Sequence, residues 1–286
     1  MISIWSDSES SEFIARYVKS FGGDLALRTY TSRLVGAAGA LVLHGGGNTS
    51  VKSTFTDLLG RDVPAVFVKA SGHDLAVIEP GGHSGMALEP LVELRALDTL
   101  SDGAMVNALR TNLFDSGAST PSIEALLHAF IPAKFIDHTH ADAILALTNQ
   151  PDGLSVVADA LGGDVIVIDY VKPGFELAKA AADAYDKAPD AVGMVLAKHG
   201  LLTWGDDARE SYEKTIDLVT RAEQYLSGKG VAHALAASKT DPFVARERFV
   251  ALAPILRGLL AVPTYDADRP YDRMILRPLI TDEALA

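Results

Sequence analysis

The pair His138 and His140 is the first place in the sequence where residue type and spacing suggest chemistry. The short run before it, Phe135–Asp137, predicts a buried strand, and alternate residues of a strand point to the same face. Both imidazoles should therefore lie side by side, where two neutral rings can bind a borderline cation such as zinc. Alone, a His-x-His pair is more often two hydrogen-bonded structural histidines.

A third histidine, His199, follows the apolar stretch Gly193–Ala197 and is followed directly by Gly200. A histidine at the end of a buried strand can reach into a cleft, although a turn residue satisfied by the backbone is the alternative. Together with the pair, it gives three imidazoles at strand ends. Three protein ligands that leave one or more positions open are typical of a catalytic metal rather than a structural one.

Glu124 is the candidate acid/base. It lies in a segment predicted to be helical from Thr120-Pro121-Ser122, because Pro121 suits the first turn of a helix. One interpretation places the carboxylate on a solvated helix face, near the positive end of the helix dipole. The other places it beside the metal, where it could abstract a proton next to a metal-polarised carbonyl. The residues alone leave both open.

Two glycine-rich turns could bind an anion. In the segment 44–50, Gly45, Gly46 and Gly47 are followed by Asn48 and two more short polar residues, and a second turn contains Ser71-Gly72. Glycine lets the backbone approach a ligand closely, and backbone N–H groups bind anions without net positive charge. A flexible hairpin turn is the alternative for each segment alone, and the spacing of a P-loop is absent.

Strands and helices have to position these residues. Strand-like runs occur at Ala40–Leu43, Ala65–Val68 and Leu75–Ile78, and paired strands are expected at Val192–Leu196 and Leu201–Trp204 around His199. Helical patterns lie between them, the first from about Ser8 to Ser20. Short strands mixed with helices predict a central sheet covered by helices. No G-x-G-x-x-G follows a strand, so a dinucleotide site is not supported.

The best domain boundary is the cluster Ser227–Gly230, at the end of a long predicted helix. We therefore expect a catalytic domain over 1–230 and an appendage over 231–286. In the appendage, Asp241-Pro242 predicts the start of a helix that runs to about Leu260, and the remaining tail should be extended.

Composition limits the possible classes of protein. The 286 residues include 48% hydrophobic and 22% charged residues, no cysteine and a net charge of −12. The charge and the lack of a basic stripe argue against nucleic-acid binding. No apolar run reaches the roughly 18 residues of a membrane span, and the N-terminus lacks a signal-peptide pattern. A cytoplasmic location without membrane partners is therefore expected.

Taken together, these motifs resemble the class II aldolase/adducin family. Five motifs occur in the family's order and span roughly 32 to 226: Gly47-Asn48-Thr49-Ser50, Ser71-Gly72, Ser122-Ile123-Glu124, His138-Thr139-His140 and Lys198-His199-Gly200. Each motif is weak alone, while five in order are specific. The chain resembles in particular the aldolase half of bifunctional rhamnulose-phosphate aldolase/short-chain dehydrogenase proteins.

The resemblance implies a three-layer α/β/α fold with a central, mostly antiparallel sheet, and a homotetramer with active sites at subunit interfaces. It implies that His138, His140 and His199 hold Zn²⁺ or another divalent cation, with Glu124 as acid/base and occasional fourth ligand. The implied substrate and phosphate cradle consists of Gly47, Asn48, Ser71, Gly72 and Ser122. Ile123 stands where members of the family often have a second serine.

The activity implied is cleavage of a phosphorylated ketose, of the rhamnulose- or fuculose-1-phosphate type, to dihydroxyacetone phosphate and an aldehyde through a metal-stabilised enediolate. The same metal site also suits an epimerase, a dehydratase or a decarboxylase acting on a sugar phosphate or sugar acid. A non-catalytic adducin-like scaffold is the remaining alternative. Adducin-type members lack the metal histidines, so their presence here favours an enzyme.

Overall fold

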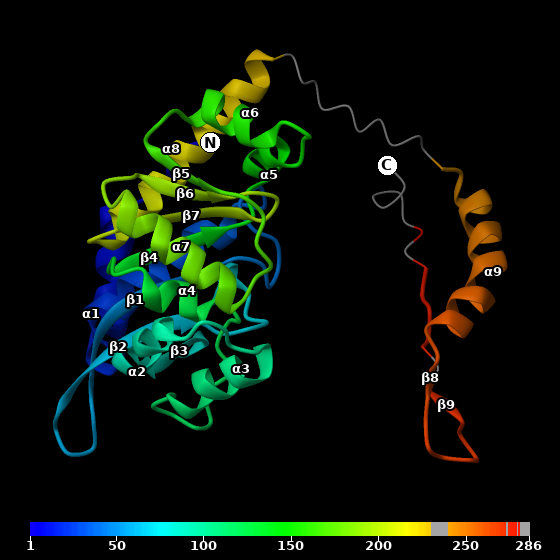
Figure 1. The fold of residues 1–286 in the computed structure, drawn as a ribbon, viewed down its shortest axis with the longest axis horizontal. Coiled ribbons are helices and arrows are strands. Elements are labelled where there is room, and N and C mark those ends of the chain that lie inside the picture. The colour runs from blue at the N-terminus through cyan, green and yellow to red at the C-terminus, as the bar shows by residue number, and fades with distance from the viewer. Residues whose placement is uncertain (230–239, 273, 279, 281–286) are drawn as a thin grey trace. The chain divides into compact units, whose positions relative to one another are not determined.

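The computed structural model describes residues 1–229, 240–272, 274–278 and 280 (Figure 1). The chain forms two compact units, Met1–Gly230 and Val231–Ala286. Residues 231–239, with which the expected appendage begins, lie outside the described residues. Among the described residues, no helix combines the length and apolar character needed to cross a membrane.

A seven-stranded sheet forms the centre of the first unit. Its order is β3-β2-β1-β4-β7-β6-β5, and every neighbouring pair is antiparallel except β5 with β6. The strands are β1 (Asn48–Thr56), β2 (Asp62–Lys69), β3 (His83–Ala87), β4 (Phe135–Thr139), β5 (Val165–Ile168), β6 (Gly193–Leu196) and β7 (Gly200–Gly205). The predicted mostly antiparallel sheet is confirmed, as is the predicted pairing of the two strands around His199.

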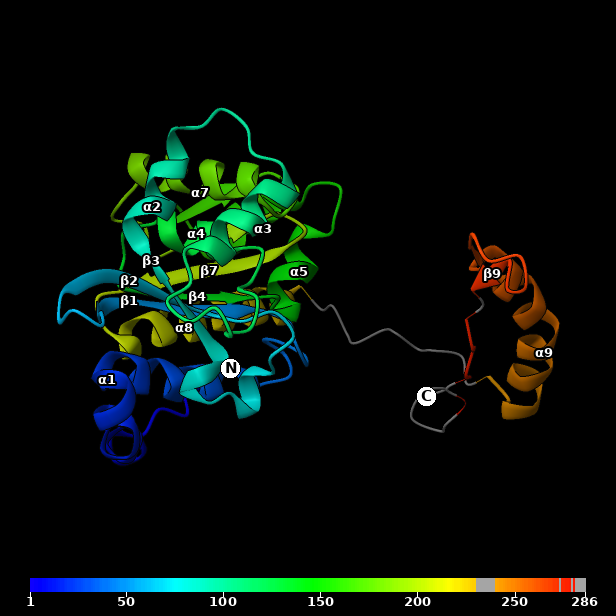
Figure 2. The ribbon, with the colours of Figure 1, turned by 90° about the horizontal axis from the view of Figure 1, so that it is seen from below.

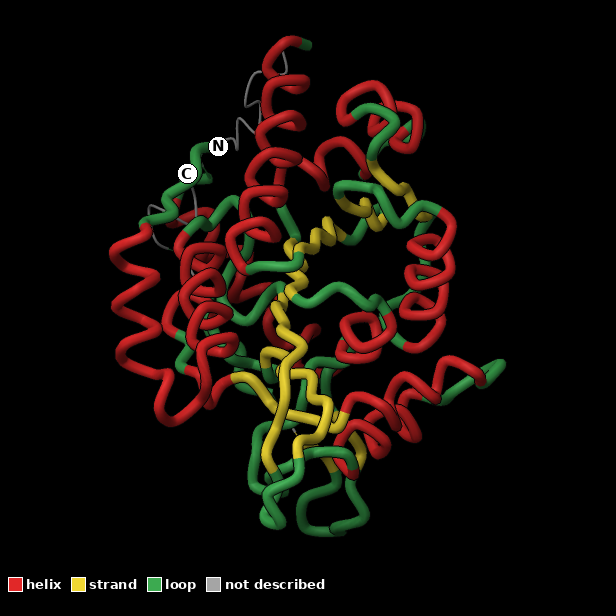
Figure 3. Tube along the Cα trace, turned by 90° about the vertical axis from the view of Figure 1, so that its left-hand side faces the viewer, coloured by secondary structure: helices red, strands yellow, loops and turns green. Residues whose placement is uncertain are grey.

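Helices cover both faces of this sheet, which gives the predicted three layers (Figures 2 and 3). One face carries α2 (Leu88–Glu93), α3 (Asp102–Thr111), α4 (Ala125–Phe130) and α7 (Phe175–Lys187). The other carries α1 (Asp7–Ala37), α5 (Asp142–Thr148), α6 (Gly153–Leu161) and α8 (Ala208–Gly228). Alternation along the strands fills both cores: on β6, Met194 and Leu196 join the first core and Val195 joins the second.

Helix α1 is much longer than the predicted Ser8–Ser20 helix. It bends at Gly22, whose φ of 79° few other residues adopt, and then continues to Ala37. Its second half places Arg28 under β4, where the guanidinium lies 2.6 Å from the carboxylate of Asp137 with both side chains fully buried. Ser211 of α8 donates to the same carboxylate. Helices α1 and α8 are thus both joined through Asp137 to the strand that contains His138.

Two predicted strands and one predicted helix start are wrong. Ala40–Leu43 is a turn, and Leu75–Ile78 contains the 3₁₀ helix η1 (Leu75–Val77). Neither run pairs with a strand, and Leu41, Val42, Leu75 and Ile78 pack into the core beside α1 instead. The helix expected from Pro121 begins only at Ala125, since Pro121 forms an isolated β-bridge with Ala70 that keeps the backbone extended.

The second unit contains α9 (Pro242–Leu259) and a short ladder of β8 (Val262–Pro263) with β9 (Tyr271–Asp272). The side chain of Asp241 accepts hydrogen bonds from the backbone N–H groups of Phe243 and Val244, so the predicted helix and its cap are confirmed. The tail was expected to be extended; within it, β9 folds back to pair with β8, and residues 273, 279 and 281–286 lie outside the described residues.

Candidate metal centre

Strand β4 places His138 in the middle of the sheet, directly opposite Asn48 of β1. The ring is buried, and its Nδ1 lies 3.1 Å from the carbonyl oxygen of Leu201. A carbonyl only accepts, so Nδ1 carries the proton and Nε2 keeps its lone pair, the tautomer that a metal ligand needs. Burial lowers the pKa of His138 to about 4, and the ring is therefore neutral at pH 7.

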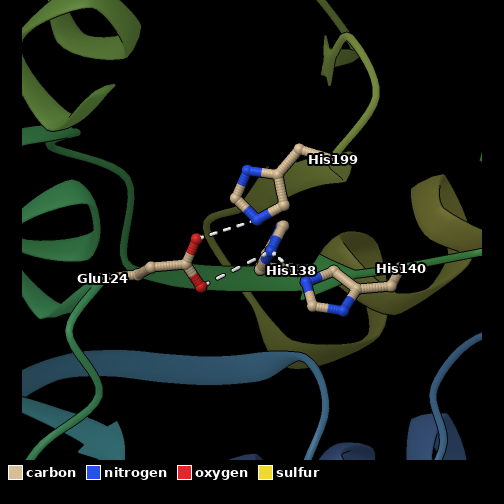
Figure 4. A group of neighbouring side chains, drawn as sticks. All are labelled: Glu124, His138, His140 and His199. Carbon is tan, nitrogen blue, oxygen red and sulfur yellow. Dashed lines mark hydrogen bonds and ion pairs between the residues drawn. The ribbon is translucent and has the colours of Figure 1, made fainter. Parts of the chain in front are cut away.

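His140 and His199 lie against this ring (Figure 4). The Nε2 atoms of His138 and His140 are 3.1 Å apart, and the centroid of the His199 ring is 4.9 Å from that of His138. His199 occupies the tight turn between β6 and β7, where Lys198 adopts a φ of 58°. A Cβ at Gly200 would lie 2.2 Å from the carbonyl oxygen of Thr139, so only glycine allows β7 to pass this close to β4.

Glu124 points at the histidines from the opposite side (Figure 4). It is the N-cap residue of α4 and is 7% exposed, so it does not lie on a solvated helix face. Its Oε1 is 3.1 Å from Nε2 of His199, and its Oε2 is 3.5 Å from Nε2 of His138. Burial alone would raise the pKa of Glu124, but His138, His199 and a hydrogen bond from Asn48 outweigh it and hold the pKa below its usual range. The group is a carboxylate.

These four side chains fit a divalent cation. One possible ligand atom from each lies within 4.8 Å of the others. Ligand atoms at the corners of a tetrahedron, bonded to zinc at about 2.0–2.1 Å, would be roughly 3.3 Å apart, close to the contacts of 3.1 to 3.5 Å found here. Oε1 of Glu124 and Nδ1 of His199 are also buried without a hydrogen-bond partner in the described part of the chain. An oxygen that faces a ring nitrogen without bonding to it suits a shared cation.

Polar residues of the predicted cradle adjoin Glu124. Asn48 Nδ2 lies 2.6 Å from Glu124 Oε2 and 3.3 Å from Ser122 Oγ. Gly47 has a φ of 60°, and a Cβ there would lie 2.8 Å from the carbonyl oxygen of His138. The structure thus brings Gly47, Asn48 and Ser122 together with Glu124 and the histidines.

Ser71 and Gly72 lie on the second glycine-rich turn, and both are exposed. A Cβ at Gly45 would be 3.6 Å from Cα of Gly72, so the two turns face each other closely. Within the described part of the chain, Ser71 makes no hydrogen bond to Glu124 or to the three histidines. Its backbone N–H donates to the carbonyl oxygen of Thr120.

Two further buried residues of this region were not among the predicted site residues. Lys69 is 2% exposed and donates to the carbonyl oxygens of Gly45 and Gly47, at 2.7 and 3.0 Å. His128 is fully buried and contacts both Asn48 and Ser50. Its position four residues after Glu124, on the same face of a helix, was the available signal.

Several known proteins resemble this chain in sequence or in fold. Residues 28–226 match the family described as "Class II Aldolase and Adducin N-terminal domain". The N-terminal class II aldolase domain of a conserved protein from Thermoplasma acidophilum is 39% identical, with a TM-score of 0.70 over 79% of this chain and 99% of that one. A sugar-phosphate aldolase from Thermotoga maritima, 17% identical over 72% of this chain and 96% of that one, shares the fold with a TM-score of 0.54.

A longer relative is the uncharacterized oxidoreductase YuxG of Bacillus subtilis, 36% identical over 262 residues. The match covers 90% of this chain, but the chain spans only 37% of that relative's length. Since the first unit holds 230 of the 286 residues, the similarity extends into the second unit. With the match of residues 28–226, these similarities show that the chain belongs to the class II aldolase/adducin family.

Proposed function

We propose that the first unit is the catalytic domain of a metal-dependent lyase that cleaves a phosphorylated ketose to dihydroxyacetone phosphate and an aldehyde. The observation that carries the proposal is the buried carboxylate of Glu124, held 3.1 Å from His199 and 3.5 Å from His138 within a cluster of three histidines. Membership of the class II aldolase/adducin family supports the same reaction class.

His138, His140, His199 and Glu124 would hold the cation, with Zn²⁺ as the first candidate. When bound, a divalent cation would polarise the substrate carbonyl and stabilise the negative charge that develops as the carbon–carbon bond breaks. Of these four residues Glu124 alone has a carboxylate, and this group can take up a proton and return it. It would deliver a proton to the enediolate carbon from which the aldehyde has left.

The donor from Asn48 keeps one carboxylate oxygen of Glu124 engaged, while Oε1 has no hydrogen-bond partner among the described residues. We assign the proton transfer to Oε1 for this reason, and the same oxygen would bind the cation only while no substrate occupies the site. Burial of the carboxylate excludes water that would compete for the same proton.

We assign the substrate cradle to Gly47, Asn48, Ser71, Gly72 and Ser122. The two glycine-rich turns face each other, and Lys69 ties the first turn to the end of β2. Exposed Ser71 and Gly72 would offer the hydroxyl of Ser71 and the backbone N–H of Gly72 to the phosphate, as anion-binding turns do. Family membership also supports a homotetramer, which light scattering of the purified protein would test directly.

A substrate panel tests the reaction. Metal-replete protein is incubated with rhamnulose 1-phosphate, fuculose 1-phosphate and pentulose phosphates, and dihydroxyacetone phosphate is measured by coupled reduction with NADH. Release from at least one ketose phosphate, abolished by a chelator and restored by the metal, is the expected result. Absence of release from every member of the panel would reject the lyase.

The same reaction mixtures separate the other reactions of such a site. Formation of an epimer without aldehyde, followed by NMR of the sugar phosphate, would replace the lyase by an epimerase. A purified protein that contains and takes up no stoichiometric metal would instead agree with an adducin-like scaffold.

A further inference from the structure

A chain of buried, hydrogen-bonded side chains lies behind Glu124. Ser50 Oγ lies 2.7 Å from His128 Nδ1, His128 Nε2 contacts Asn48 Oδ1, and Asn48 Nδ2 lies 2.6 Å from Glu124 Oε2. All four side chains are buried. The chain therefore connects a side chain outside the proposed metal site to the proposed acid/base.

The protons in this chain can be assigned outward from Glu124. A carboxylate only accepts, so the amide atom of Asn48 that faces it must be the NH₂ group, and the other must be the carbonyl oxygen. That oxygen also only accepts, so Nε2 of His128 must carry a hydrogen. Burial holds the pKa of His128 well below its usual range, so the ring is neutral and its Nδ1 accepts from the hydroxyl of Ser50.

We infer that His128 is a positioning residue: its Nε2–H fixes the orientation of the Asn48 amide, which in turn holds the Glu124 carboxylate against the three histidines. The inference rests on the metal-binding role proposed for Glu124. Without the ring, Asn48 Oδ1 loses its donor, and the amide is free to turn its oxygen toward the carboxylate. Glu124 would then lose its hydrogen bond and face a like partial charge.

The helix that carries His128 does not depend on this ring for its position. Lys52, two residues after Ser50 on β1, donates to the backbone carbonyls of His128, Ile131 and Ala133 at 2.7, 2.6 and 2.9 Å. These bonds attach the end of α4 to β1 and involve only the backbone of His128. A change confined to the imidazole should therefore act on Asn48 before it acts on the fold.

Two substitutions distinguish the role of Nε2 of His128 from that of Nδ1. In His128→Gln the side-chain NH₂ can reach the place of Nε2 and still donate to Asn48, whereas in His128→Asn it reaches only the place of Nδ1. Binding of Co²⁺ to the metal-free protein, followed by its visible absorption in competition with a chelator, reports on Glu124 without any need for activity. His83→Asn is the matched control, because His83 is also buried but bonds to Ser32 and Thr49 instead.

We expect His128→Asn to weaken Co²⁺ binding by about 10- to 100-fold, the usual effect of losing a residue that orients a ligand, and His128→Gln and His83→Asn to change it by less than about threefold. In an Asn48→Ala background, His128→Asn should cause no further loss, since its effect passes through Asn48. Unchanged affinity in His128→Asn, or an equal loss in the Asn48→Ala background, overturns the inference. A wild-type protein that binds Co²⁺ but cleaves no ketose phosphate rejects the lyase alone, whereas one that binds no Co²⁺ rejects both.

Discussion

Replacement of Glu124 by glutamine separates proton transfer from metal binding. Glutamine has nearly the same volume, and its carbonyl oxygen can still accept the hydrogen bond from Asn48 Nδ2, which is 2.6 Å from the native carboxylate. The three imidazoles remain in place. The principal loss is the group that takes up and returns the proton.

Loss of general acid/base help typically lowers turnover by about 10²–10⁴. At 1.36 kcal/mol for each factor of ten, this corresponds to roughly 3–5 kcal/mol in the activation barrier. The assay is the steady-state rate of dihydroxyacetone phosphate release at saturating substrate, with the metal content of the same sample measured by mass spectrometry. We expect a metal-loaded Glu124→Gln protein with kcat reduced by that factor.

Full activity in this variant would refute the assigned role. A second result would also contradict it: if excess metal restored wild-type kcat, Glu124 would serve as a ligand only. The corresponding aspartate variant is a useful control, since it keeps the charge but withdraws the carboxylate by one methylene. Its residual activity should depend on whether the shorter side chain still reaches the histidines.

Other predictions concern the scaffold. Gly200→Ala should lower the free energy of unfolding by about 1–3 kcal/mol and weaken metal binding, because its Cβ would meet a β4 carbonyl and the ligand rings; urea unfolding and Co²⁺ titration would detect both, and unchanged values would contradict the close approach. Asp137→Asn should cost roughly 3–5 kcal/mol in urea unfolding, because it leaves the buried charge of Arg28 without its partner, and a loss below 1 kcal/mol would argue against a buried ion pair. Burial lowers the pKa of His83 from 6.5 to about 3, so as the pH falls the His83 ring binds a proton in the unfolded chain before it does in the folded protein. The free energy of unfolding should therefore decrease below about pH 6.5, by at most about 1.4 kcal/mol per pH unit. Urea midpoints between pH 4 and 8 should vary less in His83→Asn, and an equally steep profile in that variant would rule out this source.

The prediction succeeded where one local rule determined the outcome. Alternation along a strand placed His138 and His140 on one side, and the apolar stretches around His199 became the paired strands β6 and β7. Asp241 before Pro242 began a helix where an N-cap residue should. In each case the signal lay within a few residues of the feature that it determined.

It failed where distant packing decided the structure. The apolar runs 40–43 and 75–78 satisfied a strand pattern, but they pair with no strand. They bury Leu41, Val42, Leu75 and Ile78 beside α1 instead. The first helix was predicted to end near Ser20, whereas the positive φ of Gly22 lets α1 bend and continue. His128 was not among the predicted site residues, because its partners, Asn48 and Ser50, come from a strand some 80 residues earlier in the chain.

Anomalous diffraction at the absorption edge of the bound metal tests the central claim most directly. Crystals of the purified, metal-replete protein should show one strong anomalous peak, about 2.0–2.2 Å from a ring nitrogen of His138, His140 and His199 and facing the carboxylate of Glu124. A folded protein without a peak among these four side chains, or with its metal held elsewhere, would contradict the proposed metal centre.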